Sequence, residues 1–210
     1  ALSIALHVAA GIVLAVVGIE LMPEALTASP AWIPIVAFVA GGAFFIGLER
    51  TISYVQARLG ASETSTGPLA IFSGVSLDLF SDGVMIGTGT VLNPALGLLL
   101  ALGQAPADIP EGFAAVATLR RANVPRVKRL LMALTFAVPI LVGASLGYFA
   151  LRDAPEIVTL TILAVTGGAL LSVVVEEMLT EAHSGATSRW DPVFLTAGFA
   201  LFALISVYAG

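Results

Sequence analysis

The chain has 210 residues, of which 58% are hydrophobic and 11% charged, and its mean hydropathy is +1.02. This composition predicts an integral membrane protein rather than a soluble domain. The formal net charge of -5 argues against nucleic acid as a partner, and the absence of Cys removes disulfides and thiolate metal sites.

Apolar segments follow one another along the chain, and a helix needs about 20 mostly apolar residues to cross a bilayer. We predict an all-α membrane protein with seven transmembrane helices, at residues 4–22, 31–48, 69–90, 95–119, 128–150, 157–180 and 191–209. Breaker residues separate these segments, as at Asn93-Pro94. Because no separator is long enough to form a soluble domain, residues 1–210 are expected to form a single transmembrane domain.

Basic residues indicate the orientation of these helices. They gather after the second, fourth and sixth segments, whereas the loops after the odd-numbered segments contain a single basic residue, Arg152. Lys and Arg collect in short cytoplasmic loops, so we expect Ala1 on the cytoplasmic side and Gly210 outside, in a plasma (inner) membrane. The first segment lacks a positive n-region and does not look like a cleavable signal peptide.

Two of the apolar segments carry acids. Asp78 and Asp82 lie in the segment 69–90, and Asp108 and Glu111 lie in the segment 95–119. An acid inside a membrane helix indicates a functional site, and no Lys or Arg between residues 98 and 119 neutralises the second pair.

The spacing places the acids on shared helical faces. Asp78 and Asp82 are four residues apart, while Gln104, Asp108 and Glu111 are separated by four and three. Several carboxylates cannot all stay ionised in a low dielectric, so a divalent cation or protons must balance them. Pro106 and Pro110 are expected to interrupt this helix and free carbonyl oxygens at membrane depth.

A short internal repeat suggests the architecture. The stretch from Glu20 to Ala25 matches the stretch from Glu177 to Ala182, and each is followed by a helix that opens on Trp-x-Pro. On the predicted topology, the two copies cross the membrane in opposite directions. Inverted repeats are typical of transporters, whose binding site lies near the midplane. The repeat also predicts an eighth helix before Ala1 in the native protein.

These residues resemble the ZIP (Zrt/Irt-like) family of divalent-metal transporters, over nearly the whole chain from that family's second helix onward. The resemblance rests on Glu20 to Ala25, on Asp108-Ile109-Pro110-Glu111-Gly112 and on Val173 to His183. It implies inverted three-helix repeats around the central helix pair 69–90 and 95–119, with the metal bound between those two helices. It also implies a role for Glu177 as a metal ligand.

Departures from the family pattern are equally informative. The family's fourth helix usually reads His-Asn-x-Pro-Glu-Gly, whereas this chain has Asp78-Leu79-Phe80-Ser81-Asp82-Gly83, so the central imidazole is replaced by a carboxylate. Oxygen ligands suit Mn(II) better than soft-ligand zinc chemistry, and we predict a weak bias toward harder ions. A full binuclear site is in doubt, because Pro139 aligns with the sixth-helix Glu of some members.

The predicted metal ligands are Asp78, Asp82, Asp108, Glu111 and Glu177. Further lining candidates are Gln104, Ser81, Glu176 and Met85, and candidates for a cytoplasmic exit are Glu181 and His183. We interpret His7 and His183 mainly as interfacial side chains near helix ends.

The sequence leaves three functions open. The leading prediction is alternating-access transport of a divalent metal ion of the Zn, Mn, Fe or Cd class, as substrate and with no prosthetic group. A proton-linked carrier of another solute could use the same acids as relays. An intramembrane aspartyl protease is disfavoured, because the chain lacks a Gly-x-Gly-Asp motif. We therefore expect a protein that is not an enzyme, with cations and the lipid bilayer as partners and a homodimer left open.

Overall fold

The structure is a computed structural model that describes residues 2–58, 68–184 and 188–209, and every element in that part of the chain is helical. The elements are α1 (Leu2–Ala15), η1 (Val16–Leu21), α2 (Met22–Ala25), α3 (Trp32–Arg58), α4 (Pro68–Leu92), α5 (Pro94–Arg121), α6 (Arg126–Thr135), α7 (Ala137–Leu151), α8 (Glu156–Val173), η2 (Val174–Met178), α9 (Leu179–His183) and α10 (Asp191–Ala209). The predicted all-α class is confirmed, and each predicted apolar segment consists of one helical element or of several in succession.

Four helices of the described chain are long and apolar enough to cross a membrane: Ser3–Ala25, Arg126–Leu151, Glu156–His183 and Asp191–Tyr208. Two shorter apolar helices, Trp32–Gly47 and Pro94–Ala105, belong to α3 and α5. These long apolar helices of the described chain fit an integral membrane protein.

One expectation about helix continuity is confirmed and another needs correction. The predicted segment 128–150 lies within one candidate membrane span, Arg126–Leu151, in which a turn at Phe136 separates α6 from α7. Pro139 explains the division, since proline has no N–H to donate to the carbonyl of Thr135 and its ring crowds that carbonyl. Conversely, α5 is assigned as one α-helix through Pro106 and Pro110, so these prolines do not end the element.

The helices pack in pairs through glycines that let two backbones touch. Helix α4 lies against α7, where a Cβ at Gly83 would come within 2.2 Å of the Ile140 carbonyl oxygen. A Cβ at Gly143 would meet the Phe80 carbonyl oxygen at the same distance. Small residues at helix interfaces are the usual means of close packing inside a membrane.

The centre of the bundle lies around α1 and its continuation η1. Val16 and Leu21 are fully buried there and belong to one apolar cluster with Met85 of α4, Leu163 of α8 and Phe202 of α10. Many large apolar side chains of α3, α7 and α10 are exposed instead, as Val39, Leu141 and Val207 are. This distribution is expected of a bundle whose outer face meets lipid.

One contact between helix pairs occurs twice. A Cβ at Gly11 of α1 would lie 1.9 Å from the carbonyl oxygen of Leu195 in α10. A Cβ at Gly168 of α8 would lie 1.8 Å from the carbonyl oxygen of Phe38 in α3. Gly168 follows Gly11 by 157 residues, and Leu195 follows Phe38 by the same interval.

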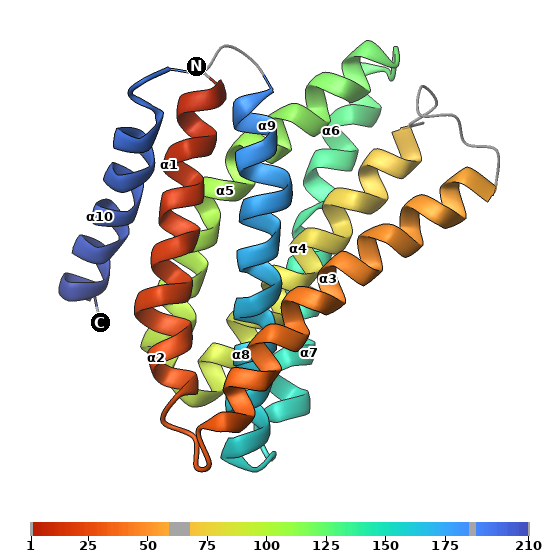
Figure 1. Cartoon of the computed structure of the whole chain (residues 1–210). Helices are drawn as coiled ribbons and strands as arrows, with labels where there is room; N and C mark the ends of the chain where they lie inside the picture. Colours follow the sequence, from red (N-terminus) through yellow and green to blue (C-terminus); the bar gives the residue numbers. More distant parts are fainter. Residues whose placement is uncertain (1, 59–67, 185–187, 210) are drawn as a thin grey trace.

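The reciprocal contacts obey the same interval. A Cβ at Gly41 of α3 would lie 1.9 Å from the Val165 carbonyl oxygen, and one at Gly198 of α10 would lie 2.0 Å from the Val8 carbonyl oxygen. The pair α1 and α10 is therefore packed as the pair α8 and α3 is packed. In Figure 1, α1 and α8 run in opposite directions.

A π-helical segment occurs at the same place in each of these two helices. The segment η1 ends at Leu21 and η2 ends at Met178, which again lie 157 residues apart. A π-helical turn carries an extra residue and is frequent at functional sites. The matched stretches that begin at Glu20 and Glu177 therefore each overlap the end of a π-helical segment.

Candidate metal centre

Helices α4 and α5 form a tight antiparallel hairpin that brings their acids to a common depth. Asn93 caps α5 by accepting a hydrogen bond from the Ala95 N–H at 2.9 Å, and Pro94 occupies the first turn. A Cβ at Gly97 of α5 would come within 2.0 Å of the Thr90 hydroxyl oxygen of α4. Glycine at position 97 therefore allows the two helices to approach closely beside the turn.

Three aspartates from this hairpin lie together. One carboxylate oxygen from each of Asp78, Asp82 and Asp108 lies within 4.8 Å of the others. Asp78 and Asp82 are one turn apart on α4, and Asp108 faces them from α5. Asp82 is the most deeply buried of the three, with 3% of its surface exposed.

Gln104 links the two helices next to this cluster. Its side-chain Nε2 donates a hydrogen bond to Oδ1 of Asp82, and 3% of the residue is exposed. Its amide oxygen Oε1 is buried and has no hydrogen-bond partner within the described structure. An amide oxygen is a competent ligand for a hard cation, so this atom adds a potential oxygen ligand to the three carboxylates.

No fixed positive charge lies in the part of these two helices that carries the cluster. Residues 68–119 contain no Lys, Arg or His. Buried carboxylates that face one another repel, and an isolated buried charge is costly. A divalent cation bound among the oxygens would relieve both penalties, and protons would relieve them in its absence.

The packing behind Asp82 holds its backbone in place. The next residue, Gly83, touches the backbone of α7, and Gly87 makes the equivalent contact one turn later, with a Cβ position 2.2 Å from the Ala144 carbonyl oxygen. Helix α4 is therefore fixed between α7 and α5. A site on helices held in this way keeps its ligands in a defined geometry.

The structure places the other predicted metal ligands differently. Glu177 is exposed on η2 and is not part of the group formed by Asp78, Asp82 and Asp108. The side chain of Glu111 lies outside the described part of the structure, so its predicted role stays untested.

The lining and exit candidates divide into buried and exposed side chains. Gln104 contacts the cluster, whereas Met85 is fully buried in the apolar cluster around α1. Ser81 is exposed beside Asp82. The remaining candidates are all exposed, on η2 and α9: Glu176, Glu181 and His183.

Sequence reasoning did not foresee the π-helical segments, which hold Glu20 in η1 and Glu176 and Glu177 in η2. Glu20 accepts a hydrogen bond from the Ser206 hydroxyl of α10. The repeated sequence around Glu20 and Glu177 was the available signal. Its spacing marks two related places in the chain, but the extra residue of a π-turn has no sequence pattern of its own.

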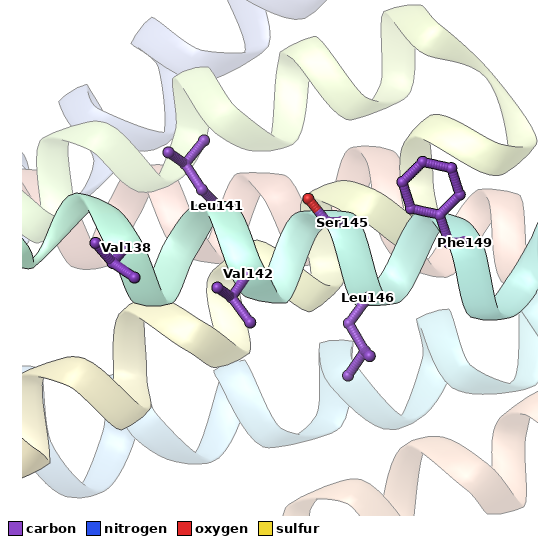
Figure 2. Close-up of a pocket in the computed structure, with 6 residues that line it drawn as sticks. All are labelled: Val138, Leu141, Val142, Ser145, Leu146 and Phe149. Atoms are coloured by element: carbon purple, nitrogen blue, oxygen red, sulfur yellow. The ribbon is translucent and has the colours of Figure 1, made fainter.

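A separate apolar groove lies on the outer face of α7. Figure 2 shows its lining side chains, which are Val138, Leu141, Val142, Ser145, Leu146 and Phe149. All of these residues are exposed, and none is acidic. The groove therefore belongs to the apolar exterior of the bundle and does not contribute to the aspartate cluster.

Comparisons with known proteins identify a family and a relative of this chain. Residues 56–206 match the model of a family described as ZIP zinc transporter. The chain is also 31% identical over 137 residues to the zinc transporter GufA of Myxococcus xanthus. That alignment covers 65% of this chain and 54% of the relative, so the chain spans about half the length of the curated relative it matches.

Proposed function

The chain belongs to the ZIP zinc transporter family, and on this premise we propose that it carries divalent metal ions across a membrane. The observation that supports the proposal most directly is the buried oxygen cluster of Asp78, Asp82 and Asp108, with Gln104 beside it. Membership of a transporter family also sets the protein apart from the enzyme alternative, the aspartyl protease.

In the proposed mechanism, the cation binds between α4 and α5 and balances the carboxylates. Asp82 and Asp108 supply charged oxygens from the two helices, and Asp78 supplies a third one turn away. The oxygen of Gln104, which has no protein partner in the described structure, completes the set. We propose that Glu111 and Glu177 also bind metal during transport. A second metal ion in the site would require these two additional carboxylates.

Alternating access would arise from the paired architecture. The reciprocal glycine contacts of α1 with α10 and of α8 with α3 support two structurally related units in opposite orientation. We propose that these units form inverted three-helix repeats around the pair α4 and α5, within one transmembrane domain. Rocking of such repeats around a fixed midplane site would expose the cation to each side in turn.

The orientation follows from the basic ends of the helices. Arg120 and Arg121 end α5, and Arg126 begins α6, so these basic residues share one end of the bundle. In Figure 1 the amino terminus lies at the same end. This arrangement supports the predicted orientation, with the amino-terminal end cytoplasmic. We propose seven crossings in an inner membrane on the same topology.

The ligand atoms also bear on ion choice. The described cluster offers oxygen alone, and oxygen ligands favour harder cations such as Mn(II). We propose that Mn(II) competes with Zn(II) more strongly in this protein than it would at a site with imidazole. Proteoliposomes with a metal-sensitive dye inside, supplied with Zn(II) and increasing Mn(II), measure this competition. A strong preference for Zn(II) or Cd(II) over Mn(II) would contradict the bias toward harder ions.

The decisive experiment separates metal transport from proton-linked carriage of another solute. Purified protein in liposomes is loaded with a metal-sensitive and a pH-sensitive dye, and Zn(II) or Mn(II) is added outside. Metal transport predicts a protein-dependent rise of the metal signal that the Asp82→Asn variant lacks. Proton movement without entry of either metal would exclude the proposal and favour the carrier.

A further inference from the structure

A second group of potential ligands lies away from the aspartate cluster, on three other elements. His7 lies near the start of α1, His183 ends α9, and Asp191 begins α10. One ligand atom from each of the three residues lies within 4.8 Å of the others. The group is at the end of the bundle where Figure 1 shows the amino terminus, beside the tops of α9 and α10.

The hydrogen bonding of His7 prepares one of its ring nitrogens as a ligand. Nδ1 lies 2.7 Å from the carbonyl oxygen of Ser3, and because a carbonyl oxygen has no proton to give, Nδ1 must donate. In the neutral ring, Nε2 then carries a free lone pair. This Nε2 is buried without a hydrogen-bond partner in the described structure, and the whole residue is 2% exposed.

His183, at the end of α9, has the same kind of hydrogen bond as His7. Its Nδ1 lies 2.6 Å from the Leu179 carbonyl oxygen, so this nitrogen is also the donor. The two rings are in contact edge to face, with centroids 5.0 Å apart and an angle of 81° between the ring planes. A backbone carbonyl that binds one ring nitrogen is the usual outer-shell partner of a metal-binding histidine.

Asp191 brings a carboxylate to the two imidazoles. It is 4% exposed, and its Oδ2 accepts a hydrogen bond from the Ser188 N–H at 2.7 Å. That bond orients the carboxylate at the start of α10. A carboxylate so deeply buried is expected to face an opposite charge or several donors.

Close helix packing holds the three residues together. Gly11, one turn after His7, lets α1 touch the backbone of α10 at Leu195, and Gly198 makes the reciprocal contact with Val8. Helix α1 also packs against α9. The positions of His7 and Asp191 therefore depend on backbone contacts rather than on long flexible side chains.

We propose that His7, His183 and Asp191 form a second metal site, which binds a Zn(II)-like divalent cation and ties α1, α9 and α10 together. Two imidazoles and one carboxylate suit zinc and related transition metals, whereas the aspartate cluster offers oxygen alone. Two ligands at about 2.1 Å from one ion are at most about 4.2 Å apart. Atoms that already lie within 4.8 Å of one another need only small rotations to meet this limit.

The test uses the full chain with the central cluster disabled. In an Asp82→Asn/Asp108→Asn background, purified protein is dialysed against Zn(II), and Co(II) is added separately to record its absorption spectrum. The background protein is expected to retain about one bound Zn(II) per chain and to give a Co(II) spectrum typical of nitrogen ligation. No bound Zn(II) in this background would overturn the proposal.

Single substitutions then assign the ligands. His183 is exposed, so His183→Ala should leave the packing intact while it removes the bound metal. Asp191→Asn keeps an oxygen that can accept from the Ser188 N–H but removes the charged ligand. Its Zn(II) affinity should fall at least about tenfold, because loss of an outer-shell partner alone costs about that much. The unfolding temperature in EDTA checks that each variant folds. His7→Gln, which should also lose Zn(II), is interpreted only if it passes that check, because His7 is buried.

Ser3→Ala is the matched control, because it removes the hydroxyl group but keeps the Ser3 carbonyl that accepts from His7. It should bind Zn(II) as the background protein does. Equal Zn(II) binding by the background, His183→Ala and Asp191→Asn proteins would refute the second site. The proposed transport function does not decide this outcome, because Asp82 and Asp108 are replaced in every protein compared.

Discussion

At the scale of single residues, Asp82 is the centre of the candidate site. It is the most buried of the three clustered aspartates, it accepts the hydrogen bond of Gln104, and it is followed by the glycine that seats α4 on α7. Its carboxylate is thus held in place by the protein before a cation arrives. A preorganised ligand of this kind should matter more for metal binding than an exposed acid elsewhere.

Replacement of Asp82 by Asn tests this role. The substitution keeps the size of the side chain and one oxygen but removes the negative charge, so metal uptake into proteoliposomes should fall by at least about tenfold. Asp153→Asn is the matched control, because Asp153 is exposed and pairs with Arg152 at 3.2 Å. Equal losses of uptake in both variants would indicate a general effect of charge rather than a metal site.

Gln104 gives a second test at this scale. Gln104→Met keeps the length of the side chain but removes both the donor to Asp82 and the unpaired amide oxygen. Zn(II) and Mn(II) affinity should therefore fall by about tenfold, whether the amide acts as a ligand or as an outer-shell partner.

The control for Gln104 is Thr88→Val. Thr88 is also fully buried on α4, and its hydroxyl donates to the Val84 carbonyl oxygen at 2.7 Å within its own helix. This variant loses a buried hydrogen bond but should keep its metal affinity. Isothermal titration of both purified variants makes the comparison, and unchanged affinity in Gln104→Met would exclude the amide from the site.

At the scale of elements, glycine positions determine which helices form pairs. Gly41 of α3 has the Val165 carbonyl oxygen 1.9 Å from the position that a Cβ would take, whereas Gly47 of the same helix has nothing within 4 Å. One helix therefore contains a glycine that the packing requires and another that it does not. The second pair also contains a glycine that the packing requires, since Gly198 meets the Val8 backbone.

Alanine substitutions in α3 test this distinction. Gly41→Ala should destabilise the bundle by about 1–3 kcal/mol, because the backbone of α8 must move away from the added methyl group. Gly47→Ala should be neutral or stabilising by up to about 1 kcal/mol, because alanine favours a helix more than glycine does. Unfolding temperatures in detergent compare the two, and equal destabilisation would contradict the packing of α3 against α8.

At the scale of the whole molecule, the junctions between helices lie at two opposite ends of the bundle, and the basic residues gather at one of these ends. The junction of α5 and α6 is at the first end, and the junction of α2 and α3 is at the second (Figure 1). An exposed apolar exterior, including the α7 groove of Figure 2, separates the two ends. This exterior serves contact with lipid as well as it would serve contact with a second copy of the chain, so the question of a homodimer stays open.

The absence of native Cys allows a direct test of orientation. Ala122→Cys lies between α5 and α6, and Ala31→Cys lies just before α3; both positions are exposed. In intact cells, a membrane-impermeant thiol reagent should label Ala31→Cys alone, and Ala122→Cys should react only after the membrane is opened. The reverse pattern would invert the proposed topology.

The sequence by itself determined the class of protein and predicted the acids of the candidate site. Hydropathy and charge are local properties, so they identified the apolar helices, the acids of α4 and α5, and the four-residue spacing of Asp78 and Asp82. The family resemblance was confirmed by the match over residues 56–206. The turn at Phe136 within the span Arg126–Leu151 was not foreseen, because Pro139 acts through a carbonyl four residues earlier and leaves the hydropathy unchanged.

Only the tertiary structure decided which residues meet across helices. Helical periodicity gives the face of a side chain but not the neighbour of that face, so Gln104 could be predicted to line a channel but not to bind Asp82. The same limit hid His7, His183 and Asp191, which come from opposite ends of the chain and meet because glycines press α1 against α10. Distance between helices is set by backbone contact, and no single segment of sequence records it.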